Sequence, residues 1–323
     1  MTQVNPALQG LEPDMDIEGL VLDVDRFASH DGPGIRTAVF LKGCPLSCAW
    51  CHSPESRGAL PELLFQAERC DGCGLCPATC PEHALVMGPS GDAEGEQQVA
   101  VLDRDACTAC GRCVEVCYPG ALRIGGASTT VGEMVKQVEA DLPFFASSGG
   151  GVTLSGGEPA RQPDFSYNFL LACQKLGIHT ALETTGYARA EVMQRLASVT
   201  DLILYDVKHV DSATHRKYAG VPNELIHANL RMLADAGHEI QVRVPCIPGV
   251  NDSASQVKEI SQLVVNAGIG QIVLLPYNSS AGAKYDWIGT PYELAERTTQ
   301  TAEYMQELAA ICRAAGLVVQ VGG

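Results

Sequence analysis

The chain has 323 residues, with 38 Asp and Glu against 22 Lys and Arg, and its formal net charge of −16 argues against nucleic acid as a partner. No apolar run approaches the ~18 residues of a membrane span, and the first basic residue is Arg26, so we expect neither a transmembrane helix nor a secretory leader. Fourteen cysteines are too many for an ordinary enzyme, and a chain this long does not depend on disulfides, so we expect metal-binding cysteines in a reducing cytoplasm.

Three zones of the chain differ in composition. Residues 1–17 are polar, contain two prolines and show no periodicity, which predicts a loose N-terminal arm. Short apolar runs at 20–22 and 38–41 predict two strands. Residues 66–125 hold eight cysteines in two similar lobes, each followed by a proline and a short strand-like run, which predicts a small inserted domain. The main domain takes the rest, residues 18–65 and 126–323.

From about residue 129 onward, helical patterns alternate with short β-rich runs. This alternation predicts repeated βα units and an α/β fold with a parallel sheet. The expected strands are 152–154, 179–182, 202–205, 240–244, 272–275 and 317–321. The expected helices are 130–142, 164–176, 189–198, 223–236, 253–267 and 291–315.

Polar or glycine-rich residues follow five of these strands in succession. In a β/α barrel, the residues just past the carboxyl ends of the strands line the active-site face. Turns are generally rich in Gly, Pro and Asn, which accounts for any one case taken alone. Five cases that include Glu, Asp and Lys favour a catalytic face. The segments are 155–159, 183–186, 206–208, 245–249 and 276–278.

A tight loop carries three cysteines, Cys44, Cys48 and Cys51, with the spacing C-x3-C-x2-C. Three thiolates can hold three irons of a four-iron cluster and leave the fourth iron without a protein ligand. An open coordination position is what a catalytic metal needs. The alternative is a structural zinc site with His52 as the fourth ligand, although zinc sites favour paired C-x2-C spacing.

Eight further cysteines form two runs with the bacterial ferredoxin spacing C-x2-C-x2-C-x3-C. In two-cluster ferredoxins the fourth cysteine of each run binds the other cluster. This rule assigns Cys70, Cys73, Cys76 and Cys117 to one cluster, and Cys80, Cys107, Cys110 and Cys113 to the other. The remaining cysteines, Cys173, Cys246 and Cys312, lie in apolar or strand-end contexts and are expected to be packing residues.

Together, the three-cysteine loop, the Ser-Gly-Gly-Glu-Pro turn at 155–159 and the strand-end motifs resemble the radical S-adenosylmethionine (SAM) superfamily. The Asp-Gly-Pro-Gly-Ile-Arg segment at 31–36 and the two-cluster insert make the chain similar to glycyl-radical-enzyme activating enzymes over roughly residues 18 to 321. The resemblance implies a partial (β/α)6-type TIM barrel with an inserted bacterial-ferredoxin-like domain.

The resemblance also implies an activity. Three 4Fe-4S clusters and SAM are the expected cofactors. In the family, an electron from the loop cluster cleaves SAM to methionine and a 5′-deoxyadenosyl radical, which takes a hydrogen atom from a backbone glycine of a partner glycyl radical enzyme. The ferredoxin domain would relay electrons from a low-potential donor such as flavodoxin or ferredoxin. An open-site cluster and a carbon radical imply an anaerobic cytoplasm.

Carried onto this sequence, the resemblance gives roles to the strand-end residues. Trp50 and His52 would pack near the cluster and adenine or shape the loop, and His30 and Asp31 are turn formers or contacts. A solvated Asp206–Lys208 pair and a surface Arg243 remain the alternatives. We expect three residues to border the methionine amino group of SAM: Gly156, Gly157 and Glu158. We expect three polar residues next to the cofactor: Glu183, where the family more often has Asp, Thr184 and Thr185. Near the cofactor carboxylate or the incoming glycine loop we expect Asp206, Lys208 and Arg243.

Two other functions fit parts of the pattern. A radical SAM enzyme acting on a small molecule would need an open cluster site in the insert, whereas each lobe has four cysteines. A polyferredoxin-type electron carrier fused to an inert barrel would not explain a three-cysteine set followed by five polar strand ends.

Overall fold

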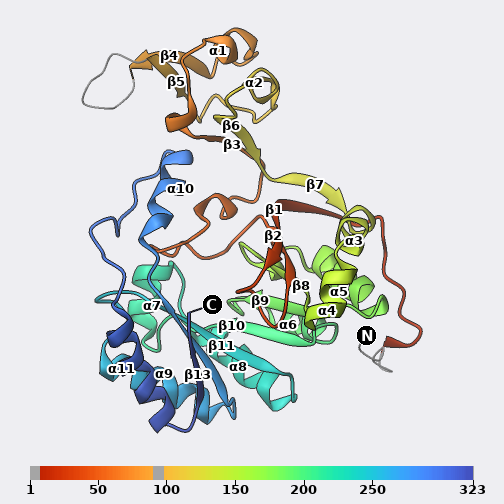
Figure 1. The fold of residues 1–323 in the computed structure, drawn as a ribbon, viewed down its shortest axis with the longest axis vertical. Coiled ribbons are helices and arrows are strands. Elements are labelled where there is room, and N and C mark those ends of the chain that lie inside the picture. Colours follow the sequence, from red (N-terminus) through yellow and green to blue (C-terminus); the bar gives the residue numbers. More distant parts are fainter. Residues whose placement is uncertain (1–7, 90–97, 323) are drawn as a thin grey trace.

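The computed structural model describes residues 8–89 and 98–322, and its main body is one mixed α/β sheet (Figure 1). Seven strands run parallel, and two antiparallel strands complete one side of the sheet. β13 and β7 are the edge strands, so the sheet is not closed into a full barrel. In spatial order the strands are β13 (Val318–Val321), β12 (Gln271–Pro276), β11 (Ile240–Cys246), β10 (Leu202–Asp206), β9 (His179–Thr184), β8 (Gly151–Gly156), β2 (Arg36–Leu41), β1 (Glu18–Ala28) and β7 (Ala127–Thr130).

All eight predicted strands are confirmed, and five of the six predicted helices are confirmed to within a few residues. Helix starts have clear local causes: Thr130 and Glu133 form a capping box at α3, and Ser253 and Gln256 form another at α9. The sequence did not predict three short helices, α4, α7 and α10. The helices around the sheet are α3 (Val131–Glu139), α4 (Leu142–Ser148), α5 (Pro163–Lys175), α6 (Ala190–Ala197), α7 (Ser212–Ala219), α8 (Glu224–Asp235), α9 (Ala254–Asn266), α10 (Gly282–Trp287) and α11 (Ala302–Ala314).

The sixth predicted helix, 291–315, is wrong in its first part. Residues 291–301 are irregular, and α11 begins only after Thr301, whose side chain accepts a hydrogen bond from the Tyr304 N–H. Tertiary contacts hold this stretch away from helical geometry. The Gln300 side chain accepts from the Tyr277 N–H at 3.0 Å and donates to the Cys246 carbonyl at 2.9 Å, so this segment is fastened across two strand ends.

The main core lies between the parallel strands and the helices that cover them. Phe165, Phe169 and Leu170 of α5 are at most 1% exposed, and they belong to one apolar cluster with Leu182 of β9 and Ile203 of β10. Burial of each such side chain contributes roughly 1.5–3 kcal/mol, so this cluster fixes the sheet on which the strand-end residues stand. The three expected packing cysteines are confirmed as buried and unpaired: Cys173, Cys246 and Cys312 are 0% exposed.

The predicted N-terminal arm lies partly outside the described residues. Its described part is not loose, which corrects the expectation. Leu8 is 2% exposed in the main core, the Asp14 N–H donates to Asn168 Oδ1 at 2.8 Å, and Lys175 pairs with Glu12 at 2.7 Å. This segment therefore packs along α5.

The cysteine-rich segment stands away from the sheet as a small unit, at the top of Figure 1. The antiparallel pair of β3 and β6 forms its base. We call residues 62–125 the ferredoxin unit. Its elements are β3 (Glu62–Phe65), α1 (Leu75–Thr79), β4 (Leu85–Pro89), β5 (Gln98–Leu102), α2 (Arg112–Glu115) and β6 (Leu122–Gly125). Among the helices in the described ranges, none is both long and apolar enough to cross a bilayer.

Candidate functional site

A cavity of about 390 Å³ opens at the carboxyl ends of the parallel strands. The three-cysteine loop forms one wall, and the ends of β8 to β12 form the others. The structure thus brings together segments that lie far apart in the chain. The lining includes Asp31, Cys44, Cys48, Trp50, Cys51, His52, Ser155, Gly156, Gly157, Glu183, Thr184, Thr185, Asp206, Lys208, Tyr277 and Asn278.

Backbone hydrogen bonds to neighbouring segments hold the three-cysteine loop in place. The Cys44 N–H donates to the Arg57 carbonyl at 3.1 Å, and the Ala49 N–H donates to the Tyr218 carbonyl at 2.8 Å. None of the three thiols is in a disulfide, and burial raises the pKa of Cys44 to about 12 and that of Cys48 to about 11. These thiols would therefore stay protonated unless a metal took the proton's place, which is how thiolate ligands behave in metal sites.

The spread of these ligands fits a cluster better than a single ion. Within the described ranges, no three His, Cys, Asp or Glu side chains converge on one ion position. The His52 ring is instead paired with Asn278, with 2.9 Å between Nε2 and Nδ2. A four-iron cluster holds its cysteines on separate irons and so spaces them more widely than zinc does. The three-cysteine loop therefore fits a 4Fe-4S cluster with one open iron, and His52 Nε2 is already engaged with Asn278.

Gly156 and Gly157 let the end of β8 lie against the base of the cysteine loop. A Cβ at Gly156 would lie 2.1 Å from the Leu41 nitrogen, and one at Gly157 would lie 2.4 Å from the Gly43 carbonyl oxygen. The Gly157 N–H donates to the Leu41 carbonyl at 2.8 Å. Only glycine allows this approach, so the two residues couple the cavity floor to the loop as well as lining the cavity.

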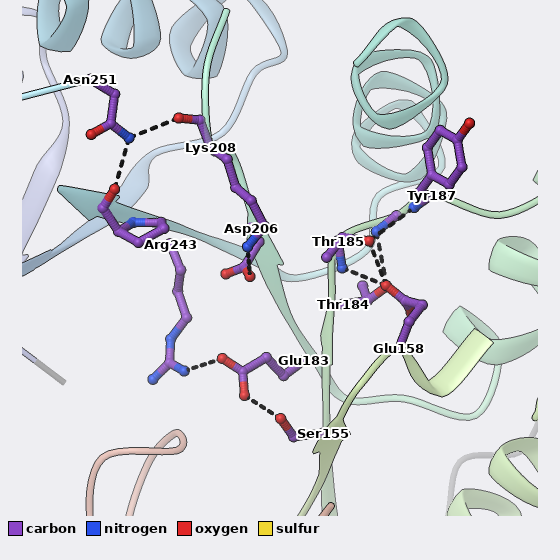
Figure 2. Close-up of polar contacts among 12 residues, drawn as sticks. Ser155, Glu158, Glu183, Thr184, Thr185, Tyr187, Asp206, Lys208, Arg243 and Asn251 are labelled. Carbon is purple, nitrogen blue, oxygen red and sulfur yellow. Dashed lines mark hydrogen bonds and ion pairs between the residues drawn. The ribbon is translucent and has the colours of Figure 1, made fainter. Parts of the chain in front are cut away.

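Glu158 does not line the cavity, unlike its predicted companions Gly156, Gly157, Thr184 and Thr185. Its carboxylate is 0% exposed and accepts hydrogen bonds from Thr184 Oγ1 at 2.7 Å, Thr185 Oγ1 at 2.6 Å and the Thr185 N–H at 2.8 Å (Figure 2). Burial raises the pKa of Glu158, and these donors oppose the rise. Glu158 thus ties the β8 turn to the end of β9 and positions the residues that do face the cavity.

Two buried ion pairs cross the cavity floor (Figure 2). Lys208 Nζ lies 2.7 Å from Asp206 Oδ2, with 9% and 17% of the two side chains exposed. Arg243 Nη1 lies 2.7 Å from Glu183 Oε1, with 6% and 23% exposed, and Ser155 donates to the same carboxylate at 2.6 Å. Because both pairs are buried, the alternatives of a solvated Asp206–Lys208 pair and a surface Arg243 are wrong.

The surroundings keep Lys208 and Glu183 charged. Burial lowers the pKa of the Lys208 ammonium, but the neighbouring Asp206 carboxylate outweighs burial and raises it. Burial raises the pKa of Glu183, yet Arg243 and Ser155 outweigh it and hold that pKa below its usual value. The cavity therefore offers paired positive and negative groups in a poorly hydrated place, which suits a zwitterion such as the amino acid end of SAM.

Arg243 and the loop at 30–34 sit between this cavity and a second one. Arg243 donates to the His30 carbonyl and lines a cavity of about 380 Å³ on the other side of the ion pair, together with His30 and Pro33. Asp31 lines the first cavity, and its carbonyl accepts from Thr153 Oγ1 at 2.6 Å. Both His30 and Asp31 are thus part of the site's wall.

Sequence reasoning gave no role to two residues beside the cysteine loop. The Arg57 guanidinium donates to the Cys48 carbonyl and to Tyr285 Oη at 3.0 Å, and it lies over the Tyr285 ring. Tyr285 Oη also lies 3.4 Å from the Ala49 carbonyl oxygen. The separation of these residues in the sequence, 228 positions for Arg57 and Tyr285, explains why no local signal reveals them.

The ferredoxin unit contains two small hollows, each lined by four cysteines. We name them the first and the second hollow. Burial raises the pKa of Cys76 and of Cys113 to about 11. The crossed sets predicted from spacing are the sets that the fold brings together. The first hollow holds Cys70, Cys73, Cys76 and Cys117, and the second holds Cys80, Cys107, Cys110 and Cys113.

Comparison with known proteins places this geometry in a family. A family model for the radical SAM superfamily matches residues 107–263, and one for a 4Fe-4S dicluster domain matches residues 69–121. The chain is 40% identical to the trans-4-hydroxy-L-proline dehydratase activating enzyme of Clostridioides difficile, over 94% of this chain and 99% of the relative.

Two further relatives are similar over most of their length. The choline trimethylamine-lyase activating enzyme of Oleidesulfovibrio alaskensis is 38% identical over 86% of this chain and 89% of the relative. The benzylsuccinate synthase activating enzyme of Thauera aromatica is 37% identical over 94% of this chain and 92% of the relative.

Proposed function

The chain belongs to the activating enzymes of glycyl radical enzymes in the radical SAM superfamily, and on this premise we propose roles for its cavity residues, its three cysteine sets and its partners. The activity is the reductive cleavage of SAM, followed by abstraction of a hydrogen atom from a backbone glycine of a partner enzyme. The observation that carries the assignment of the site is one cavity that collects the three-cysteine loop and the polar ends of neighbouring strands.

In this proposal Cys44, Cys48 and Cys51 hold a 4Fe-4S cluster with one open iron. When bound, such a cluster supplies the single electron that cleaves the S–C5′ bond of SAM. All three cysteines line the cavity, so they would hold the cluster at its wall. Trp50, at 8% exposed, shields the loop on one side.

The strand-end residues bind and orient the cofactor. Lys208 and Arg243 supply positive charge for the SAM carboxylate or the incoming glycine loop, and Glu183 supplies negative charge for the amino group. Gly156 and Gly157 allow the methionine end to approach the backbone, while Thr184 and Thr185 add hydroxyl groups fixed by Glu158. Because the ion pairs are already formed, little reorganisation is needed when SAM binds.

The two hollows of the ferredoxin unit are proposed to hold two further 4Fe-4S clusters, giving three in all. The four cysteines that line each hollow support this proposal. Full loading predicts about 12 irons per chain, four for each cluster. These clusters would accept electrons from a low-potential donor such as flavodoxin or ferredoxin.

The proposed architecture is a partial (β/α)6-type TIM barrel, formed by residues 18–65 and 126–323, with the ferredoxin-like domain inserted at 66–125. The seven parallel strands and the position of the cavity at their carboxyl ends support it. An oxygen-sensitive cluster and a carbon radical point to an anaerobic cytoplasm as the place of work.

The partner is proposed to be a glycyl radical enzyme, recognised through its glycine loop. Relatives named for a dehydratase, a lyase and a synthase are 37–40% identical to this chain. These partners differ in their reactions, yet the sequence identities to their activating enzymes are similar. This is expected if the site binds the glycine loop that the partners share and not the partner's small substrate.

The test uses the iron-loaded protein under anaerobic conditions. Reduction with dithionite in the presence of SAM should yield 5′-deoxyadenosine, detected by chromatography. Addition of the glycyl radical enzyme encoded nearby should yield a glycyl radical in electron paramagnetic resonance (EPR). The Cys48→Ala variant should produce neither, whereas Cys312→Ala, which removes a thiol outside the site, should produce both. Cleavage by Cys48→Ala at the parent rate would overturn the assignment.

A further inference from the structure

Helix α10 contacts both functional parts of the molecule. It packs on Pro54–Ser56, the turn that follows the three-cysteine loop, and on β3 at the base of the ferredoxin unit. In Figure 1 α10 lies between the sheet and the ferredoxin unit. The helix has only six residues, so its two ends lie about 9 Å apart. It is therefore a short physical bridge between the cysteine loop and the unit.

One side of the bridge contacts the catalytic loop. Tyr285 is 2% exposed, and its Oη lies 3.5 Å from the Cys48 carbonyl oxygen and 3.4 Å from that of Ala49. Lys284 pairs with Glu55 at 3.0 Å, and Glu55 is 2% exposed. Buried polar contacts of this kind fix α10 against the loop.

The other side is fastened by Arg104, three residues before Cys107. Its guanidinium donates to the Trp287 carbonyl at 2.7 Å and to the Leu63 carbonyl at 3.0 Å, so a single side chain joins α10 to β3. The Arg123 guanidinium lies 5.5 Å from the centre of the Trp287 ring. Leu63 lines the second hollow, which places that hollow next to the bridge.

The order of the two hollows follows from the direction of β3. Its first residue, Glu62, is tied to the main domain by buried Lys42, with 2.8 Å between Nζ and Oε1. Leu63, the next residue, lines the second hollow, whereas Phe65 lines the first. Two residues of strand span roughly 7 Å, so the first hollow lies farther out. Beside it, Tyr118 is 90% exposed next to Cys117.

We propose that the second hollow is the exit of the ferredoxin unit toward the catalytic loop, and that Arg104 is the positioning residue that holds it against α10. The proposal rests on the proposed function, in which both hollows hold clusters. One electron from an external low-potential one-electron donor reaches the catalytic loop for each SAM cleaved. The donor is oxidised by one electron, and no proton or group moves between the hollows.

The first experiment measures proximity and does not depend on catalysis. In the fully reduced full-length protein, the EPR signal of the three-cysteine site is identified by its loss in Cys48→Ala. Its microwave power saturation is then compared between Cys110→Ala in the second hollow and Cys73→Ala in the first, since both cysteines are exposed. We expect the half-saturation power to fall at least threefold in Cys110→Ala and to stay near the parent value in Cys73→Ala. An equal or larger effect of Cys73→Ala would overturn the order.

The second experiment tests Arg104. With photoreduced flavodoxin as donor, Arg104→Gln should form 5′-deoxyadenosine about tenfold more slowly, since a charged donor to two carbonyls is lost. Arg104→Lys should recover part of the rate, and Arg69→Gln, which removes a hydrogen bond to Gln66 within the unit, should not slow it. With dithionite, which reduces the catalytic cluster directly, all variants should match the parent.

These outcomes distinguish a failure of the proposed role of Arg104 from a failure of the proposed function. Equal rates for Arg104→Gln and Arg69→Gln with flavodoxin would overturn the role of Arg104. Failure of the parent protein to form 5′-deoxyadenosine with dithionite would overturn the proposed function, while the saturation comparison would still decide which hollow lies nearer to the loop.

Discussion

Replacing Lys208 by Met should destabilise the protein strongly at neutral pH and only weakly at acid pH. Lys208 is the ion-pair partner of Asp206 in the cavity floor, 2.7 Å away, and both side chains are largely buried. The substitution leaves the Asp206 carboxylate without a countercharge. Burial already raises the pKa of Asp206, and Lys208 opposes that rise. In the variant the carboxyl group is therefore expected to bind a proton and not to remain charged.

The loss of stability equals the free-energy cost of keeping Asp206 protonated. Keeping a carboxyl group of ordinary pKa ~3.9 protonated at about pH 7 costs about 1.36 kcal/mol for each of roughly three pH units, or about 4 kcal/mol. This agrees with the ~3–5 kcal/mol lost when one partner of a buried ion pair is removed. In the variant the folded pKa of Asp206 lies above the unfolded value, so the folded state binds more protons and gains stability as pH falls. At about pH 5 the loss should shrink to about 1.5 kcal/mol.

The assay is urea unfolding of the iron-free protein under argon with a thiol reductant, from about pH 5 to pH 7.5. The Lys208→Met, Asp206→Asn double variant is the control, because it removes both charges and should lose most of the pH dependence. A loss of the same size at both ends of the pH range, or a loss below about 1 kcal/mol at neutral pH, would refute the reasoning.

Three further predictions concern residues around the site and the core. Arg57→Gln removes a positive charge beside the cysteine loop, so the reduction potential of the catalytic cluster should fall by about 60 mV, whereas the surface variant Arg195→Gln should leave it unchanged in an EPR-monitored titration. Glu158→Gln should lower the unfolding free energy by about 2–3 kcal/mol, measured with urea, because an amide NH₂ cannot accept the hydrogen bonds of Thr185. Burial lowers the pKa of His227 to about 4, so stability should decrease as pH falls from about 6.5 toward 4, by at most about 1.4 kcal/mol per pH unit, and His227→Gln should show a flatter pH profile in urea unfolding.

The cysteine sets that line the two hollows could be predicted because the sequence fixes the spacing of these cysteines along the chain. The first three thiols of each short run can reach one cluster whatever the rest of the fold does, and the exchange of Cys80 and Cys117 between hollows follows from the ferredoxin pattern. Strands such as β9 and β10 were also predictable, because a short apolar run between a helix and a polar turn usually forms a strand in an α/β chain.

Contacts between distant segments could not be predicted. Arg57 meets Tyr285 only because α10 folds back over the cysteine loop, and Arg104 meets the Trp287 carbonyl for the same reason. The role of Glu158 was misjudged because its sequence neighbours Gly156 and Gly157 face the cavity, whereas its own side chain turns to the end of β9. Neighbours in sequence on a tight turn need not share a surface.

The irregular stretch at 291–301 illustrates the same limit in secondary structure. Its local pattern favours a helix, but hydrogen bonds of Gln300 to the ends of β11 and β12 outweigh that preference. Tertiary contacts override propensity here because each of these bonds satisfies a backbone group next to the cavity.

The central claim is that a radical formed beside Cys44, Cys48 and Cys51 removes a hydrogen atom from a partner's glycine. The most direct measurement follows deuterium from a partner enzyme labelled at the glycine α-carbon into 5′-deoxyadenosine, using the reduced iron-loaded protein and SAM. We predict deuterium in 5′-deoxyadenosine together with a glycyl radical on the partner. Unlabelled 5′-deoxyadenosine formed alongside that radical, or label transfer by Cys48→Ala at the parent rate, would contradict it.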